Sequence, residues 1–227
     1  MLKRFLDSHQ VLENTTLKNN QTALVKKWNW DYGKCLEFQL EAASFIRENP
    51  SIKILIFTNH PHCFTLGTQL QRDKNIDLNY PLPAFAVHRG GGLTFHFPGQ
   101  WIFYPILKIS ASHWGLKKLR DFLFESVIEV LKNEYGVLGE VSCEYPGIWV
   151  KEKKLASLGL GLKRYVSIHG LALNLMFDQK MKDALSGLYP CGLSSNTYTD
   201  LSNLISNSVD AEEFHQFYLH QNEDIFN

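Results

Sequence analysis

The chain has 227 residues, of which 44% are hydrophobic and 20% charged, and 23 basic side chains are balanced by 23 acidic ones. This length suits one domain with a sizeable buried core, and the composition is that of a globular protein. Because the formal net charge is zero, we expect neither a nucleic acid nor a membrane surface as a partner.

The N-terminus lacks the apolar core of a secretory signal, and no apolar run approaches the roughly 18 residues that cross a bilayer. The four cysteines, Cys35, Cys63, Cys143 and Cys191, are irregularly spaced and form no Cys-x-x-Cys pair. Such spacing favours free thiols in a reducing compartment over a disulfide framework. We therefore expect a cytoplasmic protein in which a thiol is available as a nucleophile.

The first half of the chain begins with a polar stretch, residues 1–27, which predicts an N-terminal extension, either poorly ordered or a short lead-in strand. A single domain is expected over residues 28–227. Apolar side chains at helical spacing predict a helix over 33–49, which Pro50 ends, and a compact apolar run predicts a buried strand over 53–58.

The second half alternates irregularly between strand and helix patterns. Strands are predicted over 84–88, 93–97, 101–109, 148–150, 158–162 and 166–175, and helices over 114–135, 179–187 and 210–226. This irregular order favours an α+β fold with a mixed β-sheet flanked by helices over a doubly wound fold.

A glycine-rich loop separates two of the predicted strands, in the run Arg89-Gly90-Gly91-Gly92-Leu93-Thr94-Phe95-His96. Three successive glycines let the backbone approach a ligand closely, and period two places Thr94 and His96 on one face of the following strand. The spacing does not fit a dinucleotide-binding fingerprint. A cation, a hydroxyl and an imidazole beside this loop suit an acyl group with one polar end, although a plain hairpin bend has the same composition.

Two further segments carry reactive side chains. Lys154 ends the basic run Lys151-Glu152-Lys153-Lys154, which is typical of a solvated turn, but it leads directly into a strand of small residues. Cys191 lies between Pro190 and Gly192, a combination that predicts a constrained loop of small residues. Such a loop can expose a thiol and offer backbone N–H groups to an oxyanion. A buried structural cysteine is the alternative, and a nearby cation would raise the thiolate fraction of a reactive one.

Taken together and in order, these motifs resemble the lipoyl(octanoyl) transferase family over roughly residues 30 to 200. The segments that carry the resemblance are Arg89–His96 with Pro98-Gly99-Gln100, Tyr104–Leu107, Pro146–Val150, Lys154–Gly159, Ser167–Asn174 and Pro190-Cys191-Gly192. The resemblance implies the mixed sheet of the biotin/lipoate protein ligase catalytic domain. It also implies transfer of octanoyl from octanoyl-acyl carrier protein to lysines of lipoyl domains, either those of 2-oxoacid dehydrogenase complexes or glycine cleavage H protein.

Carried over position by position, the resemblance makes Cys191 the nucleophile and Lys154 the lysine that activates it. It assigns substrate binding to three segments, Arg89–His96, Ser157-Leu158-Gly159 and Gly170-Leu171-Ala172. Because a thioester is already activated, no cofactor and no metal ion are expected. His60, His62 and Cys63 lack a fourth ligand and are better explained as a structural loop.

Phe97 departs from the family, which usually has glycine between the histidine and the proline, and a ring there is expected to narrow the pocket mouth. Residues 1–23 have no counterpart in the family. Two alternative functions remain: an ATP-dependent lipoate or biotin ligase of the same fold, and a non-catalytic module that binds acyl groups or carrier proteins. The basic cluster Lys117, Lys118 and Arg120 is either a docking patch for an acidic carrier or a solvated helix face.

Overall fold

The computed structural model describes residues 1–70, 82–110, 115–142, 144–185, 193 and 195–223. Its strands are β1 (Thr15–Leu17), β2 (Thr22–Lys27), β3 (Lys53–Thr58), β4 (Cys63–Leu66), β5 (Ala84–Ala86), β6 (Leu93–His96), β7 (Gln100–Ile106), β8 (Glu140–Ser142), β9 (Gly147–Val150), β10 (Lys153–Lys163) and β11 (Val166–Asn174). Its α-helices are α1 (Leu2–Ser8), α2 (Tyr32–Glu48), α3 (Leu116–Tyr135), α4 (Gln179–Leu185), α5 (Leu201–Ile205) and α6 (Ala211–Gln221). Single turns of 3₁₀ helix cover Leu12–Asn14 and Ser195–Thr197.

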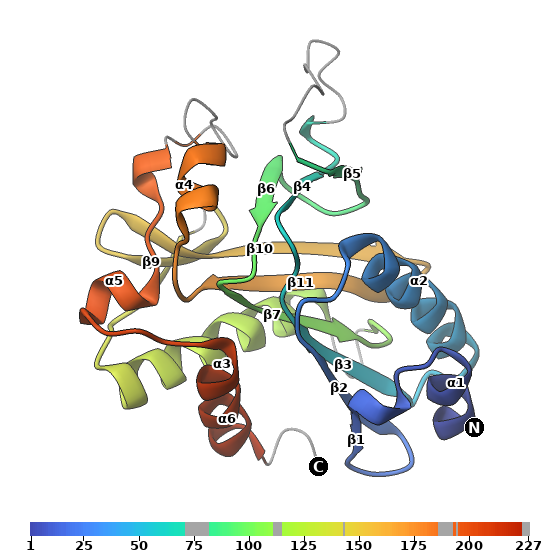
Figure 1. Cartoon of the computed structure of the whole chain (residues 1–227). Coiled ribbons are helices and arrows are strands. Elements are labelled where there is room, and N and C mark those ends of the chain that lie inside the picture. Colours follow the sequence, from blue (N-terminus) through green and yellow to red (C-terminus); the bar gives the residue numbers. More distant parts are fainter. Residues whose placement is uncertain (71–81, 111–114, 143, 186–192, 194, 224–227) are drawn as a thin grey trace.

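Eight strands form the main sheet, in the order β1-β2-β3-β7-β11-β10-β9-β8. The β2–β3 pair is parallel and the other pairs are antiparallel, so the sheet is mixed. A smaller sheet, in the order β5-β4-β6, stands above it in Figure 1. The predicted α+β class with a mixed sheet flanked by helices is confirmed.

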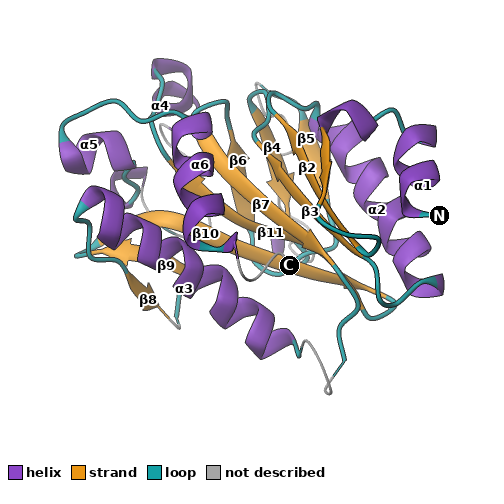
Figure 2. Ribbon diagram, turned by 90° about the horizontal axis from the view of Figure 1, so that it is seen from below, coloured by secondary structure: helices purple, strands orange, loops and turns teal. Residues whose placement is uncertain are grey.

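Helices cover both faces of the main sheet, with α1 and α2 on one face and α3 and α6 on the other (Figures 1 and 2). The main sheet has a hydrophobic core on each face, and alternate side chains of its strands point into one core or the other. Ile54 and Ile56 of β3 pack toward α2, whereas Leu55 and Phe57 pack toward α3 and α6. This is the period of two that a strand buried on both faces requires.

Helix α3 has the stripe that its sequence predicts, with Leu119, Leu123, Val127, Val130 and Leu131 all buried against the sheet. It ends at Gly136, whose φ of 64° is left-handed and whose N–H caps the last turn.

The N-terminal residues belong to the same packed structure. Strand β2 pairs with β3 from Thr22 to Lys27, and Ala23 and Val25 lie in the core beneath α2. Helix α1 packs on α2, where the Phe5 ring stacks on Phe45 with centroids 4.3 Å apart. A division of the chain at residue 27 stays a prediction.

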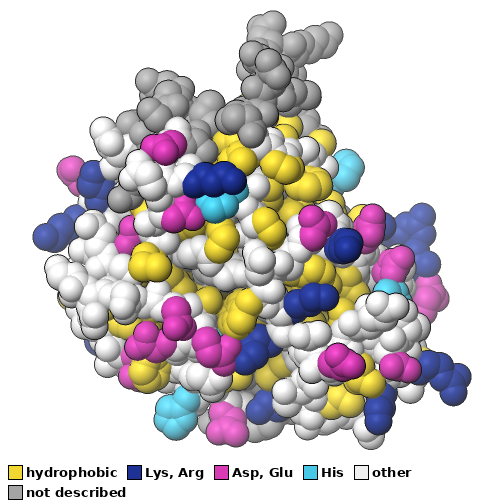
Figure 3. All heavy atoms as spheres, viewed as in Figure 1, with side chains coloured by type: hydrophobic (Ala, Val, Ile, Leu, Met, Phe, Trp, Pro, Cys, Tyr) yellow, Lys and Arg dark blue, Asp and Glu magenta, His cyan; other side chains and the backbone are white. Residues whose placement is uncertain are grey.

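The surface carries charges of both signs, interspersed over the face seen in Figure 3. Within the described residues, no helix combines the length and the apolar character needed to span a membrane.

Candidate active site

Two adjoining cavities lie where the glycine-rich loop meets β10 and β11. The outer cavity has a volume of about 560 Å³, and its wall includes Lys154, Arg89 and the start of α3. The inner cavity, with about 20 Å³, holds the volume of a single water molecule. Arg89, Thr94 and Ser157 line both, so the inner cavity continues the outer one into the protein.

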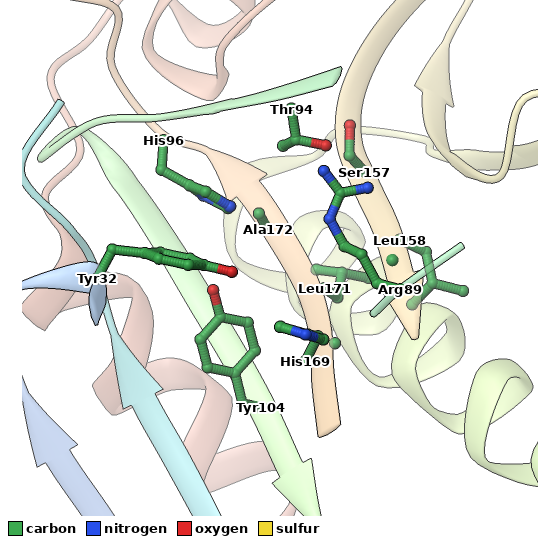
Figure 4. Close-up of a pocket in the computed structure, with 12 residues that line it drawn as sticks. Tyr32, Arg89, Thr94, His96, Tyr104, Ser157, Leu158, His169, Leu171 and Ala172 are labelled. Carbon is green, nitrogen blue, oxygen red and sulfur yellow. The ribbon is translucent and has the colours of Figure 1, made fainter. Parts of the chain in front are cut away.

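The inner cavity is lined by residues of α2, β6, β7, β10 and β11 and by Arg89 of the glycine-rich loop (Figure 4). Its lining is Tyr32, Arg89, Thr94, His96, Tyr104, Ser157, Leu158, Gly159, His169, Gly170, Leu171 and Ala172. The structure therefore brings together residues of all three segments to which the sequence assigns substrate binding. Their role in binding stays a prediction.

Arg89 holds the glycine-rich loop in place through hydrogen bonds. Its Nη2 donates to the backbone O of Thr65 (2.9 Å), to Thr65 Oγ1 (2.7 Å) and to the O of Gly92 (3.1 Å), while Nη1 donates to the O of Gly90. Arg89 as a whole is only 6% exposed. Arg89 thus ties β4 to the loop through bonds that hold the backbone in one shape.

The loop packs directly on β10 because two glycines of that strand leave room for it. A Cβ at Gly161 would lie 2.2 Å from the O of His88, and a Cβ at Gly159 would lie 2.8 Å from Arg89 Cδ. The N–H of Gly90 then donates to the O of Leu160 over 3.1 Å. The alternating Leu-Gly pattern of β10 therefore positions the loop at the cavity.

Strand β6 separates its two faces as its sequence predicts. Thr94 and His96 face the inner cavity, whereas Leu93, Phe95 and Phe97 lie in one hydrophobic cluster on the other side. Phe97 is 1% exposed and lines neither cavity, so its ring does not narrow the pocket mouth as expected from the sequence.

A chain of amides fixes which nitrogen of His96 carries the proton. Asn174 Nδ2 donates to the O of Thr199, Gln100 Nε2 donates to Asn174 Oδ1 over 3.0 Å, and Gln100 Oε1 is left to accept from His96 Nδ1 over 2.9 Å. Burial, and then the nearby His60, hold the pKa of His96 well below its usual range. His96 is therefore neutral, and its Nε2 is an acceptor that cannot donate to an oxyanion.

His60 and Tyr104 form a hydrogen-bonded pair beside the inner cavity. His60 Nδ1 donates to the O of Trp30 over 2.7 Å, so its Nε2 accepts from the Tyr104 hydroxyl at 3.1 Å. Burial lowers the pKa of His60 to about 4 and raises those of Tyr32 and Tyr104 above their usual range. Both hydroxyls stay protonated, and Figure 4 shows them pointing toward each other.

His169 has an unusual backbone for a strand residue. Its φ is 58°, in the left-handed region, and its N–H donates to Gln39 Oε1 of α2 over 2.8 Å. Burial lowers the pKa of its imidazole to about 3, and Nε2 has no hydrogen-bond partner among the described residues. A buried, neutral imidazole on a fixed backbone is suited to shaping the pocket rather than to transferring protons.

Lys154 is buried, with 3% of its surface exposed, although its sequence context is typical of a solvated turn. The turn itself consists of Lys151 and Glu152, and strand β10 begins at Lys153. The Lys154 ammonium lies 5.7 Å from the centroid of the Trp149 ring. A buried lysine in the wall of a large cavity is a candidate for proton transfer or charge stabilisation.

Cys191 and its neighbours Pro190 and Gly192 lie outside the described residues. The chain that follows them runs beside Lys154: the N–H of Thr199 donates to the O of Lys154 over 3.0 Å, and Lys154 forms a β-bridge with Tyr198. Lys153 Nζ also donates to the O of Asn196.

Burial makes Cys35 and Cys63 poor candidates for a nucleophile. Cys35 and Cys63 are buried, and burial raises the pKa of each thiol to about 12. Cys35 lies in α2 among apolar neighbours, as its place in the predicted helix indicates.

The sequence assigns no substrate-binding role to four further residues of the site. Tyr32 of α2 and Tyr104 of β7 line the inner cavity. His60, after β3, bonds to Tyr104, and Gln39 of α2 bonds to the backbone of His169, so the tertiary fold gathers all four around the cavity.

Comparison with known proteins shows which family the chain belongs to. Residues 31–222 match the family model of the lipoyl protein ligase A/B catalytic domain. An octanoyltransferase of Alkaliphilus metalliredigens is 32% identical over 202 residues, covering 87% of this chain and 91% of its own. An octanoyltransferase of Bdellovibrio bacteriovorus is 32% identical over 201 residues, covering 81% of this chain and 89% of its own.

Among solved structures, a bipartite lipoate protein ligase from Thermoplasma acidophilum, studied with its E2 lipoyl domain, superposes with a TM-score of 0.62. It shares 14% identity and covers 92% of this chain and 84% of its own, so it supports the fold alone. The chain therefore belongs to the lipoyl protein ligase A/B catalytic-domain family and, within it, to the octanoyltransferase group of acyltransferases.

Proposed function

We propose that this chain moves an octanoyl group from octanoyl-acyl carrier protein to a lysine of a lipoyl domain, through a thioester on Cys191. The observation that carries the proposal is the buried Lys154 in the wall of the 560 Å³ cavity, with the chain that follows Cys191 paired beside it. A cavity of this size is typical of small-molecule sites.

The proposed chemistry begins with the thiolate of Cys191, which the ammonium of Lys154 stabilises. The thiolate attacks the thioester carbonyl, an acyl-enzyme thioester forms, and the leaving carrier thiolate takes the proton of Lys154. The acceptor lysine amine then attacks the acyl enzyme, an amide forms and Cys191 leaves as thiolate. Lys154 takes the proton of the amine, which returns the site to its starting charge.

Apolar side chains are available for the acyl tail. Leu116, Leu158, Leu160 and Pro146 line the outer cavity. Burying the methylenes of an octanoyl chain against them would contribute about 5 kcal/mol, at roughly 0.8 kcal/mol each. Because His96 presents an acceptor to the inner cavity, backbone N–H groups are the better source of oxyanion stabilisation.

The acceptor is proposed to be a lipoyl domain of a 2-oxoacid dehydrogenase complex or glycine cleavage H protein. A solved relative in fold was studied together with an E2 lipoyl domain, which supports an acceptor of this class.

The carrier is proposed to dock at the start of α3. Lys117 and Arg120 line the mouth of the outer cavity, with side chains 82% and 47% exposed, and Lys118 lies between them in the sequence. Both also bond to Asp121, so the cluster keeps a net positive charge beside the cavity. Carrier proteins are usually acidic, and charges at an interface rim mainly raise the association rate.

The thioester is tested by intact-mass measurement after mixing with octanoyl-acyl carrier protein. We expect one octanoyl adduct that hydroxylamine removes and that is absent in Cys191→Ala, while Cys63→Ala keeps it. Lys154→Ala should acylate slowly and recover as pH rises, since solution base then supplies the thiolate. Transfer should proceed without ATP; strict ATP dependence, or no adduct under any condition, would refute the proposal.

The docking face is tested by reversing charge in Lys117→Glu with Arg120→Glu. KM for octanoyl-acyl carrier protein should rise about five- to tenfold and lose its salt dependence. Rates with a small neutral octanoyl thioester should not change. The matched control reverses Lys163 and Arg164, which line a different cavity; an equal effect there would contradict a specific docking face.

A further inference from the structure

Lys154 lies at an irregularity in the β9–β10 hairpin. Lys154 pairs with Trp149, but Ala156 pairs with Ile148, so Leu155 is one residue in excess on β10. A β-bulge of this kind changes where the flanking side chains point. Around this bulge Lys154, Leu155 and Ala156 are buried in succession, with Lys154 at the cavity and the other two in the core.

The stem of Lys154 crosses the strand at a glycine. A Cβ at Gly147 would lie 2.7 Å from Lys154 Cε and 2.2 Å from the O of Ala156. The lysine chain therefore occupies the space that a side chain at this position would take. Gly147 and Trp149 are two residues apart on β9, so both present the same face of the strand to Lys154.

The ammonium group of Lys154 lies over the indole ring of Trp149, which a hydrogen bond holds in place. The ammonium is 5.7 Å from the centroid of the Trp149 ring, within the range of a cation–π contact. Trp149 Nε1 donates to the O of Tyr145 over 3.1 Å, which fixes the ring plane. Trp149 does not line the outer cavity, so a substrate there meets Lys154 and not the indole.

Burial alone works against a charged lysine, because the ammonium loses its hydration. Among the described residues, the other charged ones in the lining of the outer cavity are three cations, Arg89, Lys117 and Arg120, and one carboxylate, Glu144. The negative face of the indole offsets part of the cost and gives the charge a direction.

We propose that Trp149, with Gly147 beside it, is the positioning residue of Lys154. Its ring keeps the ammonium charged and aimed into the outer cavity, where it stabilises the thiolate. The inference rests on the proposed function, since it assigns a partner to the lysine of that mechanism.

The test compares Trp149→Leu, which removes the aromatic face, with Trp149→Phe, which keeps one. Two rates are measured against pH: octanoylation by octanoyl-acyl carrier protein, and alkylation of Cys191 by iodoacetamide, located by peptide mass. Cys35 and Cys63 do not compete, because burial raises the pKa of each thiol to about 12. Val150→Ala, on the opposite face of β9, controls for loss of packing.

Trp149→Leu should slow both reactions about fivefold at pH 7 and shift the midpoint of each pH profile upward by about 0.7 unit, the effect of losing one desolvated cation–π contact. Trp149→Phe should stay within about twofold of wild type, and KM for the carrier should not change in either variant. Val150→Ala should leave the pH profiles in place.

Wild-type rates and midpoints in Trp149→Leu would overturn the inference. So would equal losses in the leucine and phenylalanine variants with unshifted midpoints, because these would show a packing role only. Failure of the proposed function looks different: the wild-type protein itself would then form no octanoyl adduct, whatever residue stands at position 149.

Discussion

Replacing His215 by phenylalanine should make the fold less sensitive to acid. His215 is 3% exposed, with its ring 4.6 Å from that of Phe57 and 5.7 Å from that of Trp28. Its Nδ1 has no hydrogen-bond partner among the described residues. Burial, and then the charge of Lys26, lower the pKa of this imidazole from 6.5 to about 4.

The sign of the effect follows from the direction of that shift. Above pH 6.5 the ring of His215 is neutral in both states and stability is complete. Below pH 6.5, His215 binds a proton in the unfolded chain but not in the native state. The free energy of unfolding therefore falls with pH until the pH reaches the native pKa, about 4. At 1.36 kcal/mol per pH unit, lowering the pH from 6.5 to 5.0 costs about 2 kcal/mol through this residue.

Urea unfolding at pH 7.5 and pH 5.0 measures the effect. Other buried histidines also contribute to acid sensitivity, so the informative quantity is the difference between proteins in stability lost between the two pH values. His215→Phe should lose about 2 kcal/mol less than wild type. His220→Gln, at an exposed position on the same helix, should lose as much as wild type. A His215→Phe protein with the wild-type loss would refute the assignment of a neutral buried imidazole.

Three further substitutions test the architecture around the site, each by chemical denaturation. Arg89→Lys should destabilise the fold by about 3 kcal/mol, because a lysine cannot replace the fork that bonds Thr65 and Gly92 at once; an unchanged midpoint would contradict the pinning role. Gly170→Ala should cost about 3 kcal/mol or more, since the added Cβ would lie 2.1 Å from the O of Phe103 and force two central strands apart. Gly136→Ala should cost only about 1 kcal/mol, because its Cβ would meet nothing within 4 Å and the left-handed φ is the sole penalty; a larger loss would point to a contact that the helix end does not show.

Features that depend on local pattern were predictable from the sequence. The strand over residues 53–58 has the bounds predicted from its apolar run, and the stripe of α3 and the two faces of β6 follow their periodicities. Strand β2 was not predicted beyond a possible lead-in, because its apolar core is the three residues 23–25 and its parallel pairing with β3 is not local.

The candidate site likewise combines features that the local sequence predicts with features that depend on tertiary contacts. Its glycine loop and the small residues of β10 carry their own signals, but the burial of Lys154 does not. A run of four charged residues is typical of a solvent-exposed turn, whereas the last of them, beside the bulge at Leu155, is buried. Likewise Tyr32 and Tyr104 reach the inner cavity from elements that nothing in the sequence links.

The main sheet ends on both sides in a strand of only three residues, β1 at one edge and β8 at the other. A free edge exposes unpaired N–H and C=O groups that can recruit a strand of another molecule, and short edges offer few of them. The proposed function requires two other proteins to bind in turn, and short edges limit unwanted association with them along the sheet. Lengthening either edge by design should favour aggregation at high concentration.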